Sequence, residues 1–576
     1  MRIDKLYIDE FKNLRDFTID LNDSSMHTVL LGQNAAGKSN LLDLFQIIFS
    51  NRSFSHTDFK DVSAEILIEI TVKLDDIEIG NFEDLCDGVN PNFINIVCKQ
   101  ETVDDNIEFQ HKETEIYIPA SRIRAANFIH YNSLRNPIQE VQFGKSKGVG
   151  KFLNNIVQKY LKDNSLTNSD FLNEDKINEL LVFVNDNIVK IKTFNDFDIS
   201  AVSDDKLESL LPKILVFEDE NNNPLSQSGY GIQFLILITL SILEKVENII
   251  NKQVSNTIFE TSDGKKYISL IIGLDEPEVH LHPYMQRSLI KYLNKVISNS
   301  NSEFGTLLKD LFNIDGFLGQ IILVTHSPNI LSNDYKQIIR FYKDNHQTKI
   351  ISGNSFEFDV QESKHLHILF TFIKESFFSR GVILVEGDSE YGSFPYFANK
   401  LGYEFDDLGI CLIQTGGDGG IQPSINILNK FSIPVVAIRD RDNYIGTHAE
   451  PIYFTDKRDF EEELIEANIE NDIDFLKNVV LEYDPSGIDR KLEKDSINKR
   501  LFTKSGISKY TNITTLISAD LYLRNCSEIN DFRYFYLSWY SINKGILSGA
   551  IIGEKIKQQN IPNIYKTVID KIVELS

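Results

Sequence analysis

The segment Gly32-Gln-Asn-Ala-Ala-Gly37-Lys38-Ser39 constrains the fold more than any other part of the chain. It follows the apolar run of residues 28–31 and precedes an apolar pattern with helical spacing over residues 41–48. A strand, a glycine-rich loop and a helix in this order form a phosphate-binding loop, in which backbone N–H groups and the positive end of the helix dipole surround an anion. The segment therefore predicts an α/β domain with a nucleotide site.

The side chains of this loop have separate predicted roles. Lys38 would reach the β- and γ-phosphates of ATP, and the Ser39 hydroxyl would hold Mg²⁺. A chance glycine-rich turn is the alternative, and it would arise in on the order of one chain in fifty of this length. The predicted nucleotide contacts here are Gly32, Asn34, Gly37, Lys38, Ser39 and Asn40.

Two later apolar strands end in residues that such a loop requires. One ends in Asp275 and Glu276, of which the first suits the outer shell of Mg²⁺ and the second suits orienting or deprotonating a water molecule. The other ends in His326, where the imidazole could sense the γ-phosphate. Taken singly, both could be ordinary strand ends.

A second anion-binding turn precedes the apolar helix predicted over residues 234–243. Its residues Ser228, Gly229 and Gly231 lie at a helix N-terminus. We count this turn among the nucleotide contacts. Because the first loop already binds its own phosphates, we expect the turn to close over a nucleotide held by another subunit.

Along the chain the order is the glycine-rich loop, the Ser-Gly turn, the Asp-Glu pair and the histidine. Motifs in this order resemble the ABC-type ATPase heads of the SMC/Rad50 class. The opening residues 8–14 and residues 278–283 also resemble that class. The signature turn departs from the family pattern, since it is Ser-Gly-Tyr-Gly and not Leu-Ser-Gly-Gly-Gln, and no glutamine loop can be assigned. No long heptad pattern separates the two halves of the head, which excludes a coiled-coil arm.

Carboxylates follow two apolar strands in the last third of the chain. Glu386 ends the first strand and Glu390 comes after a turn, while Asp440 and Asp442 end the second. Alternation along a strand would put Asp440 and Asp442 on one side, at the carboxyl edge where open α/β sheets place functional groups. Such oxygens suit Mg²⁺ or Mn²⁺, which in phosphodiester hydrolysis activate water and support the leaving oxygen. A flavodoxin-like sheet with acidic strand ends is the alternative.

This Glu-Gly and Asp-x-Asp arrangement resembles the TOPRIM fold shared by topoisomerases, primases and certain nucleases. An ABC-type ATPase followed by TOPRIM is similar to the OLD (overcoming lysogenisation defect) family, whose Gabija-type and retron-associated relatives are anti-phage nucleases. The resemblance covers nearly the whole chain.

The resemblance also implies site residues. It makes Glu386, Asp440, Asp442 and Lys544 catalytic, with Lys544 stabilising charge on the phosphate being cut, beside the ATPase residues Glu276 and His326. In a later acidic motif we favour Glu461 as the family's ligand, with Asp459 and Glu462 as alternatives. The motif could equally be the solvated start of a helix, and Lys544 could equally be a surface lysine. The glycine turn at residues 416–420 is expected to be structural, with Asp418 a minor candidate. The implied metal ligands are Glu386, Glu390, Asp440, Asp442, Glu461 and Asp459, with Ser39 at the ATPase site.

The expected fold class is α/β, an ABC/SMC-type ATPase head with an inserted helical module, followed by a Rossmann-like TOPRIM domain. The first part of the ATPase takes residues 1–147 and the second takes residues 224–357. The inserted module, with dimerisation as one candidate role, takes residues 148–223, and the TOPRIM nuclease domain with a C-terminal helical segment takes residues 358–576.

The formal net charge of −25 argues against general adhesion to DNA or anionic lipid, although a basic groove can coexist with an acidic surface. Basic runs lie at residues 122–124, 145–151 and 490–504. No apolar run approaches the ~20 residues that span a bilayer. The start has no signal-peptide pattern and the four cysteines lack metal-ligand spacing, which favours a cytoplasmic protein.

The leading hypothesis is an ATP-binding, metal-dependent DNA endonuclease or nickase in anti-phage defence, with the ATPase regulating the nuclease. The alternative is an SMC/Rad50-like repair or recombination ATPase whose C-terminal domain only binds nucleic acid; three convergent carboxylates argue against it. The resemblance implies ATP, Mg²⁺ or Mn²⁺, DNA, a homodimer or homotetramer, and an encoded partner that is a helicase or a reverse transcriptase with its RNA.

Overall fold

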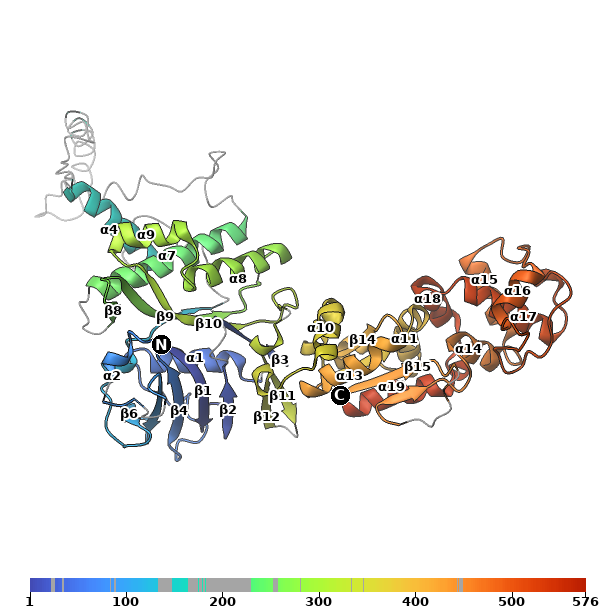
Figure 1. The fold of residues 1–576 in the computed structure, drawn as a ribbon, viewed down its shortest axis with the longest axis horizontal. Coiled ribbons are helices and arrows are strands. Elements are labelled where there is room, and N and C mark those ends of the chain that lie inside the picture. Colours follow the sequence, from blue (N-terminus) through green and yellow to red (C-terminus); the bar gives the residue numbers. More distant parts are fainter. Residues whose placement is uncertain are drawn as a thin grey trace, which may run out of the picture. The chain divides into compact units, whose positions relative to one another are not determined.

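The computed structural model divides into two compact units (Figure 1). The first comprises Met1–Thr18, Asn22–Val29 and Ser39–Ile330; the second comprises Ile19–Leu21, Leu30–Lys38 and Leu331–Ser576. The structure describes residues 1–21, 26–33, 36–82, 84–86, 90–132, 148–163, 175, 179, 182, 229–251, 257–279, 281–332, 334–344, 347–442, 444 and 449–576.

A five-stranded sheet contains the first two strands of the chain. Its central pairings, β1 with β4, β4 with β5 and β5 with β6, are antiparallel. Side chains along β4 and β5 alternate between buried and half-buried positions, as expected for a sheet with one covered face. The order is β2 (Phe17–Asp20), β1 (Arg2–Asp9), β4 (Ile66–Lys73), β5 (Phe93–Gln100) and β6 (Glu108–His111).

A seven-stranded sheet contains the strands that carry the ATPase motifs. Its strands β10, β9 and β7 are parallel, and β9 is buried over most of its length, which is typical of a central parallel strand. The order is β12 (Gln347–Ser352), β11 (Ile338–Asp344), β3 (His27–Gly32), β10 (Gly316–Val324), β9 (Lys266–Asp275) and β7 (Asn127–Tyr131), with β8 (Ile258–Glu260) paired to β9.

The helices of this part of the chain include the one predicted after the glycine-rich loop. They are α1 (Lys38–Ile48), α2 (Ala120–Ile123), α4 (Gly148–Asp163), α7 (Tyr230–Asn251), α8 (Pro283–Ile297) and α9 (Ser302–Phe312). Of the proposed inserted module, the structure describes α4 and three single residues, and the rest lies outside the described residues.

The last third of the chain contains a four-stranded parallel sheet, as the Rossmann-like prediction required. Its order is β14 (Ile410–Gln414), β13 (Gly381–Val385), β15 (Val435–Arg439) and β16 (Ile452–Phe454). The helices are α10 (Val360–Ile373), α11 (Asp388–Leu401), α12 (Phe405–Leu408), α13 (Ile421–Lys430), α14 (Phe460–Asn468), α15 (Ile473–Tyr483), α16 (Lys494–Leu501), α17 (Ile529–Ile542), α18 (Ile546–Lys555) and α19 (Asn563–Leu575).

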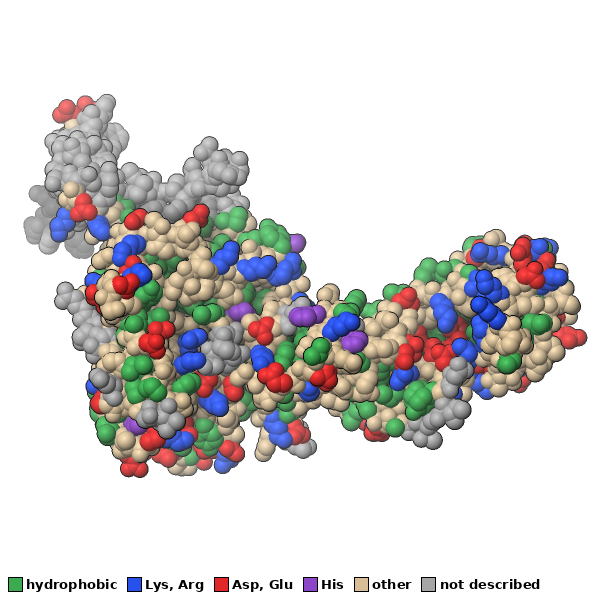
Figure 2. All heavy atoms as spheres, viewed as in Figure 1, with side chains coloured by type: hydrophobic (Ala, Val, Ile, Leu, Met, Phe, Trp, Pro, Cys, Tyr) green, Lys and Arg blue, Asp and Glu red, His purple; other side chains and the backbone are tan. Residues whose placement is uncertain are grey.

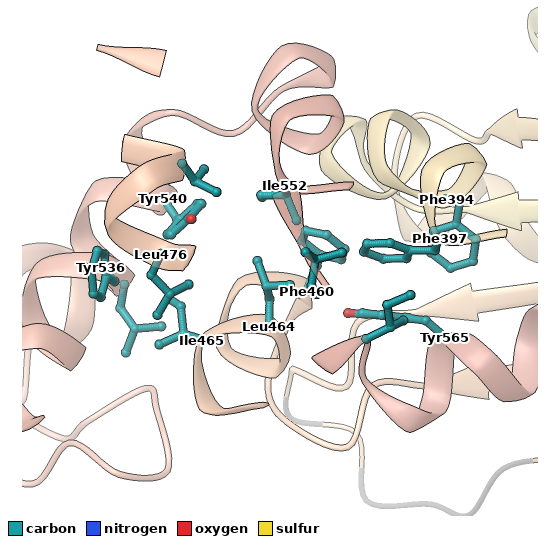
Figure 3. Close-up of a cluster of buried hydrophobic side chains, with 14 of the residues drawn as sticks. Phe394, Phe397, Phe460, Leu464, Ile465, Leu476, Tyr536, Tyr540, Ile552 and Tyr565 are labelled. Carbon is teal, nitrogen blue, oxygen red and sulfur yellow. The ribbon is translucent and has the colours of Figure 1, made fainter. Parts of the chain in front are cut away.

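An aromatic cluster supports the helices at the carboxyl edge of this sheet (Figure 3). The Tyr565 ring lies 5.4 Å from the Phe460 ring, 5.5 Å from the Phe394 ring and 5.8 Å from the Phe397 ring, measured between centroids. Burying each of these side chains contributes about 1.5–3 kcal/mol. The cluster therefore fixes the beginning of α14 against α11 and α19.

Helices α11 and α18 pack with their backbones in contact. A Cβ atom at Gly392 would lie 2.2 Å from the Ile546 carbonyl oxygen, and a Cβ atom at Gly549 would lie 2.2 Å from the Ser389 carbonyl oxygen. Only glycine allows this approach, which holds the N-terminal end of α18 beside the start of α11.

A buried arginine joins β11 to the segments that precede β13 and β15. Arg340 is 1% exposed and donates hydrogen bonds to four backbone carbonyl groups. Burial lowers the pKa of its guanidinium to about 10. The acceptors are the carbonyl oxygens of Phe377 (3.3 Å), Ser379 (3.1 Å), Phe431 (3.1 Å) and Ser432 (2.9 Å).

No helix in the described ranges is long and apolar enough to cross a membrane.

Candidate active site

The glycine-rich loop has the backbone geometry that its sequence predicts. Gly32 has a φ of +125°, and a Cβ atom there would lie 1.9 Å from the Phe341 carbonyl oxygen, so only glycine fits. Gly37 also has a positive φ, of 97°. The Lys38 ammonium is buried and donates to the carbonyl oxygens of Gly32 (2.9 Å) and Gln33 (2.8 Å), which holds it along the loop. Asn34 lies outside the described residues.

The hydroxyl group predicted to hold Mg²⁺ contacts the predicted acidic residue. Ser39 Oγ donates to Asp275 Oδ1 at 3.0 Å, as expected of two groups that share a hydrated cation. Asn40 instead donates to Asn13 Oδ1 at 2.7 Å, so its side chain braces the start of α1.

The predicted catalytic glutamate and sensor histidine of the ATPase are neighbours. His326 Nε2 lies 3.5 Å from Glu276 Oε1, and both side chains are about one-third exposed. Glu276 has a φ of +48°, a left-handed conformation rare for a residue with a side chain, which marks a position under constraint.

Glu278 contributes to this group and was not predicted as a site residue. Its Oε1 accepts the backbone N–H of His326 at 2.5 Å, and burial raises the pKa of its carboxyl group. Its position two residues after Glu276, following a proline, is the sequence signal that could have identified it.

The second anion-binding turn lies partly within the described residues. Gly229 is exposed, and its carbonyl accepts N–H groups at the start of α7. Gly231 packs closely, since a Cβ atom there would lie 3.1 Å from Met285 Cε. Ser228 lies outside the described residues.

Four carboxylates converge at the carboxyl edge of the TOPRIM sheet. Glu390 is in the first turn of α11, Asp440 follows β15, and Asp459 and Glu461 begin α14. Burial raises the pKa of Glu390, and the charge of Glu461 adds to the rise; burial likewise raises the pKa of Asp440, with contributions from Glu390 and Asp459. Figure 2 shows Asp and Glu side chains concentrated between α11 and α14.

The start of α14 is oriented from both sides. The Phe460 side chain is buried in the aromatic cluster, while its backbone N–H donates to Asp440 Oδ1 at 3.0 Å. Asp459 caps the helix by accepting the Glu462 N–H at 2.9 Å. Asp440 thus lies at the positive end of a helix dipole.

Lys544 faces these carboxylates from just before α18. Its Nζ lies 2.6 Å from Glu461 Oε2 and 4.0 Å from Asp459 Oδ2. Burial lowers the pKa of Lys544, but the charges of Glu461 and Asp459 outweigh this and raise it above the ordinary value. The lysine therefore carries a positive charge at any physiological pH.

Glu386, Asp418 and Asp442 form a more exposed group beside the first. Burial raises the pKa of Glu386, and the charges of Asp418 and Asp442 add to the rise. Asp418 pairs with Arg439, and Asp442 pairs with Arg458 at 2.6 Å. The Asp440 N–H donates to Glu386 Oε2 at 3.2 Å, which connects the two groups.

The strand alternation expected at Asp440 and Asp442 is not what positions them. β15 ends at Arg439, and Asp442 has a φ of +42°. The chain has therefore left the extended conformation. Asp440 turns toward Glu390 and Glu461, whereas Asp442 remains exposed beside Arg458.

Two further residues support the site without having been predicted. Ser389 Oγ donates to Glu461 Oε1 at 3.3 Å, and the Tyr510 hydroxyl donates to Asp459 Oδ2 at 3.3 Å. Tyr510 comes from a loop 51 residues further along the chain, so no local pattern indicates it.

The residues fit a divalent cation by their chemistry. Among the described residues, no group of three or more Asp, Glu, His or Cys side chains is placed to hold a metal ion as the side chains stand. Their oxygens are instead engaged by Lys544 and by the Phe460 N–H. Carboxylate oxygens are nevertheless the ligands that Mg²⁺ and Mn²⁺ prefer, and three buried acids together with the half-buried Asp440 face one lysine.

Family models match both parts of the chain. Residues 1–197 and 155–331 match the AAA ATPase domain. Residues 377–442 match the model described as "Overcoming lysogenization defect protein-like, TOPRIM domain", a stretch that includes Glu386, Glu390, Asp440 and Asp442. The chain belongs to the OLD family. An ATPase domain precedes a TOPRIM nuclease domain in this chain, so the predicted family and fold class are confirmed.

Three curated proteins are relatives of this OLD chain. The "Old nuclease" of Escherichia phage P2 is 29% identical over 239 residues, which covers 39% of this chain and about a third (36%) of the phage protein. The "OLD nuclease" of Thermus scotoductus is 21% identical over 477 residues, covering 76% of this chain and 81% of the relative. "Endonuclease GajA" of Bacillus cereus is 23% identical over 530 residues, covering 73% and 71%.

Two solved structures are also similar in part. An Smc head bound to the C-winged helix domain of ScpA is 13% identical, covers 63% of this OLD chain and all of its own, and has a TM-score of 0.33. The C-terminal region of the Xanthomonas campestris pv. campestris OLD protein is 21% identical, covers 35% and 95%, and has a TM-score of 0.23.

Proposed function

We propose that this protein is an ATP-binding, metal-dependent DNA endonuclease or nickase of anti-phage defence, in which the ATPase domain regulates the TOPRIM nuclease. Its relatives named as nucleases and as an endonuclease support the reaction class. The similarity to Endonuclease GajA favours the Gabija-type branch, and with it the defence role.

The convergence of acids on Lys544 is the observation that carries this proposal. Glu390, Asp440 and Glu461 come from three separate elements and are held together although burial and mutual repulsion raise their pKa values. A domain that only bound nucleic acid would gain nothing from concentrating negative charge, because DNA phosphates repel it. The binding-only SMC/Rad50-like alternative is disfavoured for this reason.

We assign the metal to the carboxylate groups described above. Glu390, Asp440 and Glu461, with Asp459, would hold one Mg²⁺ or Mn²⁺, and Glu386 with Asp442 would hold a second. Ions in this setting polarise a phosphodiester and favour ionisation of water. Lys544, being positively charged, stabilises negative charge on the phosphate that is cut.

The nucleotide site consists of the glycine-rich loop with Ser39, Asp275, Glu276 and His326. We propose that Glu276 orients the attacking water and that Gly229 and Gly231 close over a nucleotide bound by another subunit. The assembly would then be a homodimer or a homotetramer, with a separately encoded helicase or reverse transcriptase as the candidate partner.

The test compares cleavage of supercoiled plasmid and linear DNA by wild type, Asp440→Ala and Glu386→Ala in Mg²⁺, Mn²⁺ and EDTA. Both variants should fall to the EDTA level while binding ATP normally, because the glycine-rich loop is unaltered. Asp407→Ala is the matched control, since this exposed aspartate precedes β14 and so lies at the opposite edge of the parallel sheet. Wild-type cleavage rates in both carboxylate variants would refute the site.

A further inference from the structure

A hairpin with an exposed tip follows α16 in the helical segment of the TOPRIM unit. Phe502 pairs with Ser508 in an antiparallel bridge. The Thr503 N–H donates to the Ile507 carbonyl oxygen at 2.8 Å, which closes the tip. This hairpin, residues 501–511, contains the end of the basic run that the predicted sites do not use.

The tip of the hairpin is braced. Gly506 has a φ of +76°, and its N–H donates to the Thr503 carbonyl oxygen at 3.0 Å. The Thr503 hydroxyl accepts the Ile507 N–H at 3.1 Å and lies 2.9 Å from Ser505 Oγ. The side chains at the tip are therefore presented from a defined backbone.

The base of the hairpin is attached to the nuclease site. The Thr511 N–H donates to Glu462 Oε1 at 2.6 Å, and the Tyr510 hydroxyl donates to Asp459 Oδ2 at 3.3 Å. Arg458 also donates to the Lys509 carbonyl oxygen at 3.4 Å. These contacts flank Glu461, so the hairpin has a fixed relation to the carboxylates.

The tip combines positive charge with an apolar side chain. Ile507 is 66% exposed, and Lys504, three residues earlier in the same tip, is also exposed. Within the described part of the chain, Lys504, Lys499 and Arg500 form no ion pair, and Figure 2 shows Lys and Arg side chains next to the concentration of acids. Unpaired cations on a protein of net charge −25 are suited to phosphate groups.

We propose that this hairpin holds and distorts duplex DNA beside the cleavage site, with Lys504 on a backbone phosphate and Ile507 inserted between base pairs. The inference rests on the proposed nuclease function. Isoleucine is among the side chains that DNA-bending proteins insert as wedges. Four residues lead from Ile507 to Thr511, a stretch of chain that reaches at most roughly 13 Å, or about four base-pair steps. The wedge acts on base pairs flanking the scissile phosphate.

The test uses Ile507→Ser and Lys504→Gln on an intact duplex and on one with a mismatch about four base pairs from the cut. Ile507→Ser should cleave the intact duplex about tenfold more slowly, and the mismatch should restore its rate because the distortion is already present. Lys504→Gln should weaken binding and lower the slope of log affinity against log salt by about one.

Two control variants match these changes. Leu516→Ser removes an apolar side chain that is 56% exposed and lies outside the hairpin. Lys400→Gln removes a lysine near the end of α11, roughly 18 Å along that helix from its first residue. Both should cleave and bind as wild type does.

Several outcomes would overturn the inference. Ile507→Ser that cleaves the intact duplex at the wild-type rate, or that is equally slow on both duplexes, rejects the wedge. Lys504→Gln with unchanged affinity and salt slope rejects the phosphate contact. If wild type cuts no DNA, the proposed nuclease function fails separately, and unchanged duplex binding by both variants would then reject the hairpin inference by itself.

Discussion

Glu461 and Glu462 are adjacent and both buried, yet their carboxylates have different contacts. Glu462 accepts N–H groups from Arg458 at 2.8 Å and Thr511 at 2.6 Å, so it joins two loops. Glu461 faces Lys544. A helix turns about 100° per residue, which sends consecutive side chains in different directions.

These contacts predict opposite effects for two matched substitutions. Glu461→Gln should remove cleavage and leave thermal stability close to wild type, because it takes away a site charge. Glu462→Gln should retain part of the cleavage but lose about 1–3 kcal/mol of stability, because one amide oxygen cannot accept both N–H groups and the buried amide nitrogen would face the other one. Plasmid cleavage in Mg²⁺ and thermal unfolding followed by circular dichroism measure both. The reverse pattern would assign the functional carboxylate to Glu462.

The family resemblance favoured Glu461 and left Asp459 and Glu462 as alternatives, and the sequence alone could not decide among the three. The distinction depends on Lys544 and Thr511, which are distant in sequence and approach through packing. The error about Asp442 has a local cause, since its left-handed φ ends the alternation that the prediction assumed. The sequence therefore predicted that acidic residues follow these strands, but it did not predict which way their side chains point.

At the scale of elements, the contact between α11 and α18 aligns Lys544 with the carboxylates. Lys544 directly precedes Gly545 and α18, and Gly392 and Gly549 allow the two helix backbones to touch. A side chain at either glycine would push the two helices apart and would thereby move Lys544.

Gly549→Ala should therefore impair the nuclease without touching its charged groups. The new Cβ atom would lie 2.2 Å from the Ser389 carbonyl oxygen, so α18 must shift away. A displacement of about 1 Å can cost roughly 100-fold in rate, and overpacking costs about 1–3 kcal/mol in stability. Cleavage rates and thermal unfolding measure the two effects.

Gly305→Ala is the control for this experiment. Gly305 lies within α9 and has no heavy atom within 4 Å of its Cβ position, so alanine should be neutral or slightly stabilising. Wild-type cleavage by Gly549→Ala would show that the fit between α11 and α18 does not position Lys544.

Most elements around the sites follow from local sequence patterns. The apolar run before Gly32 forms β3, and those before Glu386 and Asp440 form β13 and β15. The hairpin at residues 501–511 and the packing of α18 were not predicted, because both depend on contacts between distant segments. Short-range periodicity carries no information about such contacts.

At the scale of the whole molecule, the glycine-rich loop up to Lys38 and the TOPRIM sheet fall within one compact unit. The Gln33 N–H donates to the Phe341 carbonyl oxygen at 3.3 Å, and the preceding residue, Arg340, donates to four carbonyl groups of the TOPRIM part. A change in the loop can therefore be transmitted through β11.

We expect the nucleotide state of the ATPase to change the nuclease rate through this connection. Coupling between two sites is typically ~1–3 kcal/mol, which corresponds to about five- to 150-fold in an affinity. We expect ATP to inhibit the nuclease, because resting cells contain ATP and a nuclease that cuts DNA must then remain inactive.

The measurement compares DNA cleavage without nucleotide, with ATP and with a non-hydrolysable analogue. In Lys38→Ala the response should disappear because ATP no longer binds. In Arg340→Lys it should weaken while ATP binding persists, since an ammonium group cannot donate to all four carbonyls. Equal wild-type rates in every nucleotide state would mean that the two domains work independently.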